Sequence, residues 1–216
     1  DHRRRQPRRE VRILMRHKAA LIAALIIPAV FLTSCALSLT EQDGKLVDKK
    51  TGVTYVSAPL CYEPERTGEE VYATCKKLKL DLYEIDGLEP TEWLSEQYEG
   101  IGGVWHSVDT TLPDDITGFD ADRMYICQEK VITVSLGTVD DKDDIDAVVK
   151  AFTEGEPVSL VQEGESYKLK FASDKYPGLY YNLMYIEGGD GNNYIYDRTT
   201  KTCVDVGDVL LDYLPR

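Results

Sequence analysis

The chain has 216 residues, of which 43% are hydrophobic and 29% are charged, so it can bury the core of an ordinary globular domain. Its net charge of −13 is distributed unevenly: the first 34 residues carry +6, which leaves −19 for the rest of the chain. A body this acidic repels phosphate backbones and anionic lipid surfaces. The composition therefore argues against a nucleic-acid partner and against flat docking on a membrane.

A basic and then apolar segment begins at Met15. Its first residues are Met-Arg-His-Lys, its apolar stretch covers residues 19–32, and it ends with Leu32-Thr33-Ser34-Cys35. The apolar stretch is shorter than the ~20 residues that a transmembrane helix needs. This order of a basic region, an apolar region and small residues is typical of a secretory signal peptide, which we place at residues 15–34.

The four residues that end this segment resemble the lipobox of bacterial lipoproteins, which has an aliphatic residue, two small residues and an obligatory cysteine. The resemblance covers residues 15–35 only. It implies that the Cys35 thiol carries a diacylglycerol and that cleavage falls between Ser34 and Cys35. Because two acyl chains suffice for stable anchoring, it also implies a protein held by lipid on the extracytoplasmic face of the cell membrane.

The residues on either side of this signal lead to two further expectations. Residues 1–14 are rich in arginine and start with Asp, so we interpret them as an upstream extension of the gene. A twin-arginine export signal is the alternative. Residues 36–50 are polar, charged and without apolar periodicity, which favours a flexible tether after the lipidated Cys35.

Residues 51–216 are expected to form the extracytoplasmic domain, and strand patterns dominate them. Polar Gln128-Glu129-Lys130 predicts one hairpin turn, and the glycine-rich residues 188–192 predict another. A change of subdomain near Gly155 is an alternative to a single domain. We expect strands at residues 54–57, 78–85, 104–108, 124–127, 131–136, 167–171, 180–186, 194–197 and 204–206.

One amphipathic helix is expected at residues 142–153, because Ile145, Val148, Val149 and Phe152 fall on one helical face and Asp141 can cap it. Two short helices are expected, one starting near Thr91 and one at residues 208–214. Hairpins combined with few helices predict an α+β fold built on an antiparallel sheet.

Four cysteines follow the proposed anchor, and an extracytoplasmic address permits disulfides between them. The sequence leaves two readings open, namely disulfide pairing or buried free thiols. It contains no C-x-x-C spacing, so a zinc ribbon and a thioredoxin motif are not expected. The four are Cys61, Cys75, Cys127 and Cys203.

No catalytic, cofactor or metal motif is recognisable in the rest of the chain. His106 is the single histidine after residue 35, and the adjacent Ser107 points to the opposite face of a strand, so the two do not form a dyad. Acidic clusters at residues 114–122 and 140–146 do not have the spacing of an EF-hand. Calcium could bind the loop at residues 188–193, but a hairpin turn explains the same residues.

The aromatic residues are mostly tyrosines, 14 against 4 Phe and 2 Trp. Several lie on expected strands and form a candidate surface for an envelope protein or a glycan. The sequence therefore favours a non-enzymatic, acidic binding or structural module of the cell envelope. The alternative is an envelope hydrolase whose active site lies around His106 or clustered carboxylates. The candidate binding residues are Tyr180, Tyr181, Tyr185, Tyr194 and Tyr196.

Overall fold

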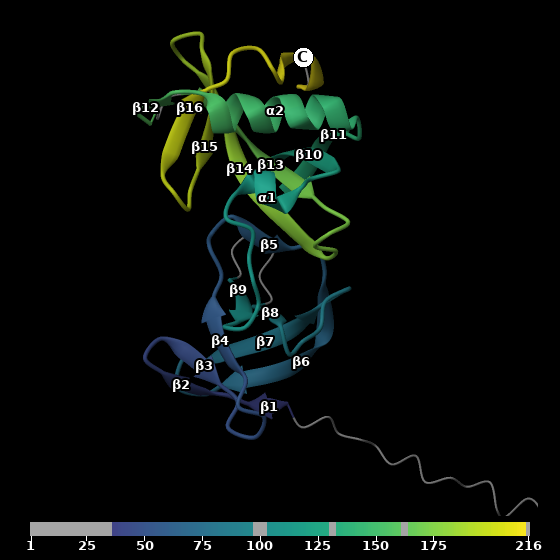
Figure 1. Ribbon diagram of the computed structural model, residues 1–216, viewed down its shortest axis with the longest axis vertical. Helices are drawn as coiled ribbons and strands as arrows, with labels where there is room; N and C mark the ends of the chain where they lie inside the picture. The colour runs from purple at the N-terminus through teal and green to yellow at the C-terminus, as the bar shows by residue number, and fades with distance from the viewer. Residues whose placement is uncertain (1–35, 97–102, 130–132, 161–163, 215–216) are drawn as a thin grey trace, which may run out of the picture. The chain divides into compact units, whose positions relative to one another are not determined.

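The structure is a computed structural model that describes residues 36–96, 103–129, 133–160 and 164–214 (Figure 1). It is mostly β, with 49% of the described residues in strands and 12% helical, and one of its two sheets is nearly closed like a barrel. The expected α+β class is therefore wrong. The hairpins were recognised, but the nine-residue strand at Thr67–Cys75 and several very short strands that complete the two sheets were not.

The first sheet has the strand order β1-β6-β7-β8-β9-β4-β3-β2. Its two end strands are consecutive in the chain, joined only by Leu39, whose amide donates to the Thr74 carbonyl at 2.8 Å. This covalent link nearly closes the sheet on itself. The strands are β1 (Leu37–Ser38), β2 (Thr40–Gln42), β3 (Lys45–Val47), β4 (Thr54–Ser57), β6 (Thr67–Cys75), β7 (Leu80–Ile85), β8 (Trp93–Glu96) and β9 (Val104–Ser107).

The predicted flexible tether is part of this sheet. Residues 37–47 form β1, β2 and β3, and Leu39 and Leu46 are 4% and 0% exposed in the core inside the sheet. The β2–β3 turn is Asp43-Gly44, with φ of 50° and 78°, which is the residue pair that a tight hairpin turn favours. The segment was misread because each strand is too short to show alternation.

The second sheet has the order β11-β10-β13-β14-β15-β16-β12, with β5 added beside β14. Both expected hairpin pairings are confirmed, since β10 pairs with β11 and β14 with β15 in antiparallel fashion. The turn position expected for the first hairpin is wrong, because Gln128 and Glu129 continue β10 and pair with Val134 and Thr133. Strands from both sides of Gly155 share this sheet, so the chain does not divide there. The strands are β5 (Tyr62–Pro64), β10 (Arg123–Glu129), β11 (Thr133–Val139), β12 (Pro157–Val158), β13 (Gly164–Ala172), β14 (Leu179–Gly188), β15 (Asn193–Asp197) and β16 (Thr202–Asp205).

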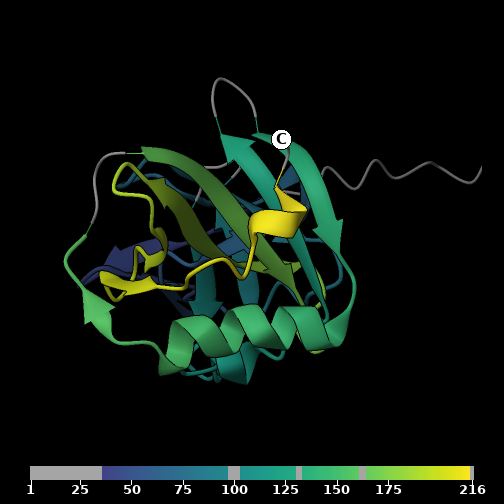
Figure 2. The ribbon, with the colours of Figure 1, turned by 90° about the horizontal axis from the view of Figure 1, so that it is seen from above.

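The predicted amphipathic helix is present as α2 (Lys142–Glu154), and Asp141 caps it by accepting from the Asp143 amide. It runs along one side of the second sheet, where Ile145 and Val148 are buried (Figures 1 and 2). The other helices were predicted poorly. Residues expected to start a helix near Thr91 form β8, and the predicted C-terminal helix is a single 3-10 turn, η1 (Leu211–Tyr213). A four-residue helix, α1 (Ile116–Phe119), was not anticipated.

The burial of Leu46 leads to a test of the corrected N-terminal boundary. We expect Leu46→Ala to lower the free energy of unfolding by about 3 kcal/mol, because the change opens a cavity inside the first sheet. Urea denaturation of the two proteins measures this difference.

The matched control is Leu60→Ala, since Leu60 is 69% exposed and its loss should change stability by less than about 0.5 kcal/mol. Equal unfolding midpoints for Leu46→Ala and the parent would show that residues 37–47 are not packed as described.

Candidate functional site

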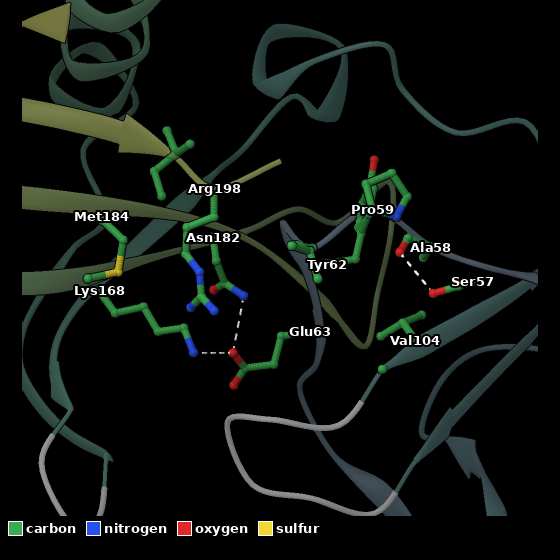
Figure 3. A pocket seen from close by; sticks show the side chains of 13 residues that line it. Ser57, Ala58, Pro59, Tyr62, Glu63, Val104, Lys168, Asn182, Met184 and Arg198 are labelled. Carbon is green, nitrogen blue, oxygen red and sulfur yellow. Dashed lines mark hydrogen bonds and ion pairs between the residues drawn. The ribbon is translucent and has the colours of Figure 1, made fainter. Parts of the chain in front are cut away.

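A cavity of about 300 Å³ lies where residues of the first sheet meet the second (Figure 3). This volume is at the lower end of the range for small-molecule sites. The first sheet contributes the segment after β4 and the start of β9, and the second contributes β5, β13, β14 and the β15–β16 turn. Its lining residues are Ser57, Ala58, Pro59, Leu60, Tyr62, Glu63, Gly103, Val104, Lys168, Asn182, Leu183, Met184 and Arg198.

Strand alternation brings the polar lining residues together. In β13, Leu169 belongs to the hydrophobic core, so its neighbours Lys168 and Lys170 occupy the opposite face of the sheet. The register places Met184 beside Lys168, and Asn182 beside Lys170. One face of the second sheet is therefore apolar under α2, whereas the other carries buried charges.

Glu63 on β5 is the centre of these charges. Its Oε2 is 2.5 Å from Lys168 Nζ, and its Oε1 is 2.5 Å from Lys170 Nζ. Lys168 also contacts Glu129 Oε1 at 2.5 Å, and the Asn182 amide donates to Glu63 Oε2 at 3.1 Å. The side chain of Lys168 is only 4% exposed, and those of Glu63 and Lys170 are each 13% exposed. We call these five residues the charged cluster.

The cluster keeps Glu63 and Lys168 ionised despite their burial. Desolvation alone would raise the pKa of Glu63, but hydrogen bonds and charge from Lys168 and Lys170 hold that pKa below its ordinary value. Desolvation would lower the pKa of Lys168, and its bonds to Glu129 and Glu63 raise it instead. Each buried charge therefore depends on a partner of opposite sign.

Some polar groups at the cavity are not used by the cluster. The Asn182 Oδ1 atom and the Tyr62 hydroxyl are buried and have no hydrogen-bond partner among the described residues. Arg198 is exposed, and it makes no ion pair or hydrogen bond within the described residues. In Figure 3 its side chain points toward Asn182 and Lys168. An acceptor and a cation are thus available to a bound molecule.

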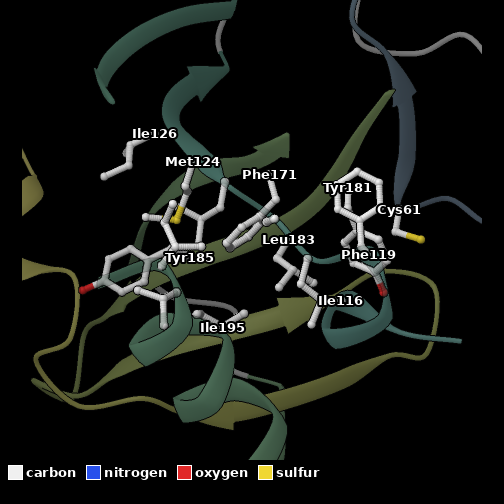
Figure 4. Packing of buried hydrophobic residues seen from close by; sticks show 14 of the residues in the cluster. Cys61, Ile116, Phe119, Met124, Ile126, Phe171, Tyr181, Leu183, Tyr185 and Ile195 are labelled. Atoms are coloured by element: carbon white, nitrogen blue, oxygen red, sulfur yellow. The ribbon is translucent and has the colours of Figure 1, made fainter. Parts of the chain in front are cut away.

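The five tyrosines proposed as a binding surface do not share an exposed face. Tyr181 and Tyr185 are buried in the core of the second sheet (Figure 4), and Tyr194 is buried in a separate small cluster. Burial raises the pKa of Tyr181 and Tyr185 above the ordinary value. Tyr180 and Tyr196 are only half-buried. The alternation that was expected to expose these rings directs most of them inward.

His106 and Ser107 do not assemble a catalytic pair. The His106 ring packs near Trp93, with ring centroids 5.8 Å apart, and its Nδ1 lies 2.9 Å from the Ser107 carbonyl oxygen. The Ser107 hydroxyl accepts from the Asp109 amide at 3.3 Å. Both side chains therefore take part in local contacts of β9 and the turn that follows it.

The acidic clusters serve local structure. Asp115 caps α1, Asp120 and Asp146 both pair with Lys142, and Asp140 pairs with Arg123. No group of His, Cys, Asp or Glu among the described residues is arranged to hold a metal ion. In the loop considered for calcium, Asp190 accepts from the Tyr194 hydroxyl at 2.6 Å and closes the β14–β15 turn.

A second cavity of about 240 Å³ lies between the end of α2 and the β15–β16 turn. Three carboxylates line it, those of Asp114, Asp115 and Asp197. Asp115 is used in helix capping, and Asp197 accepts from the Thr199 amide and the Thr200 hydroxyl. Two of the three carboxylates are therefore used in local structure. The first cavity is for this reason the stronger candidate for a binding site.

The four cysteines that follow residue 35 are all buried. Cys61, Cys75 and Cys127 are free thiols, which fits the second of the two readings left open by the sequence. Cys203 lies at the β16 position that pairs with Tyr196. Burial raises the pKa of the Cys61 and Cys127 thiols, and a raised pKa reduces the thiolate that a nucleophile needs.

The signal segment, including Ser34 and Cys35, lies outside the described residues. No helix in the described part of the chain is long and apolar enough to cross a membrane. Comparison of the chain with protein-family models, with curated proteins and with solved structures finds no match.

Sequence reasoning missed Glu63, Lys168, Asn182 and Arg198. The alternation of Lys168 and Lys170 was visible, but lysines on a half-buried strand are typical of a solvated face. Only the pairing of β5 with β14 reveals that Glu63 neutralises them, and no local pattern predicts that pairing.

The charged cluster predicts a pH-dependent effect of Glu63→Gln. We expect this change to lower the free energy of unfolding by about 3 kcal/mol at pH 7, because it leaves buried ammonium groups short of a partner. The pKa of Glu63 is lowered in the folded state, so the wild type has this stabilisation above about pH 4.5 and loses it as the pH falls through that lowered pKa. The difference in free energy of unfolding between the wild type and Glu63→Gln should therefore become smaller in acid.

Urea denaturation between pH 7 and pH 3 measures this effect. Glu69→Gln is the control, because Glu69 is exposed and its change should cost less than about 0.5 kcal/mol at any of these pH values. If the difference in free energy of unfolding between Glu63→Gln and the wild type is the same at pH 3 as at pH 7, the Glu63 carboxylate is not ionised in the way described.

Proposed function

We propose that this chain is a lipid-anchored extracytoplasmic lipoprotein whose acidic domain acts as a binding module of the cell envelope. The observation that carries the proposal is Leu32-Thr33-Ser34-Cys35 at the end of a basic and then apolar segment. A thiol at that position can accept a diacylglycerol, and small residues before it suit cleavage. The membrane is then a partner through the lipid on Cys35.

The binding role draws its support from the cavity at the charged cluster. It replaces the tyrosine surface as the candidate site, because three of those five rings are buried. An ion pair holds Glu63 and Lys168 in place at the cavity, and a hydrogen bond to Glu63 holds Asn182. A preformed site loses little freedom when it binds a ligand.

Replacement of Cys35 tests the anchor. We expect Cys35→Ala to abolish labelling by a metabolic palmitate analogue, because alanine offers no thiol for the lipid. The variant should also keep its signal segment and migrate as the larger precursor in gel electrophoresis.

Ser34→Ala is the matched control, since alanine is also small and leaves Cys35 in place. It should be labelled and cleaved like the wild type. Equal labelling of Cys35→Ala and the wild type would refute lipidation at this cysteine.

A further inference from the structure

The amide of Asn182 is oriented by the charged cluster. Its Nδ2 donates to Glu63 Oε2 at 3.1 Å, and the reverse orientation would face an acceptor oxygen toward the carboxylate. Oδ1 is consequently the atom left buried and without a partner in the described part of the chain. Buried acceptors in proteins are normally satisfied, so a donor from outside the chain is expected to meet this atom.

Positive charge is available at the same place. Lys168 uses two of its three N–H donors for Glu63 and Glu129, and Arg198 keeps its whole guanidinium group for a ligand. The carboxylates of Glu63 and Glu129 balance Lys168 and Lys170, so Arg198 is the cation of the cavity lining that has no ion pair among the described residues. A single negative charge on a bound molecule would neutralise it.

Arg198 lies on a turn that other bonds hold in place. Asp197 accepts from the Thr199 amide at 2.7 Å, and the Thr199 hydroxyl accepts from the Cys61 amide at 2.9 Å. The second bond ties the β15–β16 turn to the segment that leads into β5. The base of Arg198 is therefore fixed relative to Glu63 and Asn182.

Ser57 and Tyr62 bring two hydroxyl groups to the cavity lining, and much of the remaining wall is apolar. The apolar part includes Pro59, Leu60, Val104 and Met184, and Leu60 is 69% exposed. The wall suits a short hydrocarbon group, and the modest volume suits a compact molecule. The −19 charge of the chain after residue 34 repels polyanions, so a compact ligand with one negative charge fits better than a long polyanion.

We infer that this cavity binds a small carboxylate that also carries a hydrogen-bond donor and a short apolar group, the chemistry of an N-acylated amino acid. The carboxylate pairs with Arg198 and the free donor of Lys168. The ligand N–H donates to Asn182 Oδ1, and the apolar group contacts Leu60 and Met184. This inference deepens the proposed binding role and does not depend on lipidation of Cys35.

The test is calorimetric titration of the full chain, in a mild detergent, with N-acetyl-L-leucine. We expect saturable binding with a Kd of about 1 mM or tighter. N-acetyl-L-leucinamide lacks the carboxylate and 4-methylpentanoate lacks the N–H, so each should bind at least about fivefold more weakly.

Variants assign the binding to this cavity. Arg198→Gln should weaken binding at least about tenfold, and Asn182→Ala about fivefold. Lys150→Gln removes the same unit of charge from an exposed position on α2 and should leave binding unchanged. Because Arg198 is exposed, its variant is expected to keep the wild-type melting temperature, which circular dichroism checks.

Four results would overturn the inference: no saturable binding, equal binding of the leucinamide, unchanged binding by Arg198→Gln, or unchanged binding by Asn182→Ala. A lack of saturable binding would mean that Asn182 Oδ1 meets only water. Failure here leaves the palmitate experiment unaffected, so the ligand and the lipid anchor are judged separately. Binding by Cys35→Ala should equal that of the wild type.

Discussion

The carboxylate of Glu63 has to be neutralised inside the protein, and this requirement connects the two sheets. β5 lies in the chain between β4 and β6, which belong to the first sheet, yet it pairs with β14 of the second. Glu63 is held there by Lys168 and Lys170 of β13. A segment that leaves the first sheet is thus fixed to the second by charge as well as by backbone hydrogen bonds.

The register of β5 follows from the same arrangement. Tyr62 and Glu63 are adjacent and point to opposite faces, the ring into the aromatic core beside Phe119 and Tyr181, and the carboxylate toward the lysines. A slip of one residue would bury the carboxylate among aromatic rings and leave both lysines unpaired. Buried ion pairs contribute little net stability, but a wrongly placed one is very costly, so the cluster specifies a single pairing.

The parts of the fold that could be predicted are those with local signals. Alternation and turn residues identify the β14–β15 hairpin, and 3.6-residue periodicity with Asp141 as cap identifies α2. Pairings between distant residues carry no such signal, as for Glu63 and Lys170, which are 107 positions apart in the chain. Very short elements are also hard to assign: β8 was mistaken for a helix because four residues show no clear period. Asp43-Gly44 was a readable turn signal, but strands of three residues on either side gave no support.

The N-terminal strands place a limit on where the proposed cleavage could fall without disrupting the first sheet. Leu39 closes the first sheet by its bond to Thr74, and β1 starts at Leu37, so a chain that began later than Leu37 would lose this closure. Cleavage before Cys35 would leave β1 complete. It would also leave Ala36 as the one residue between a lipidated Cys35 and the first strand, where the sequence had indicated a tether of fifteen residues. The same few residues would then serve both the closure of the sheet and the attachment to lipid, and the domain would have no long linker through which to move independently of its anchor.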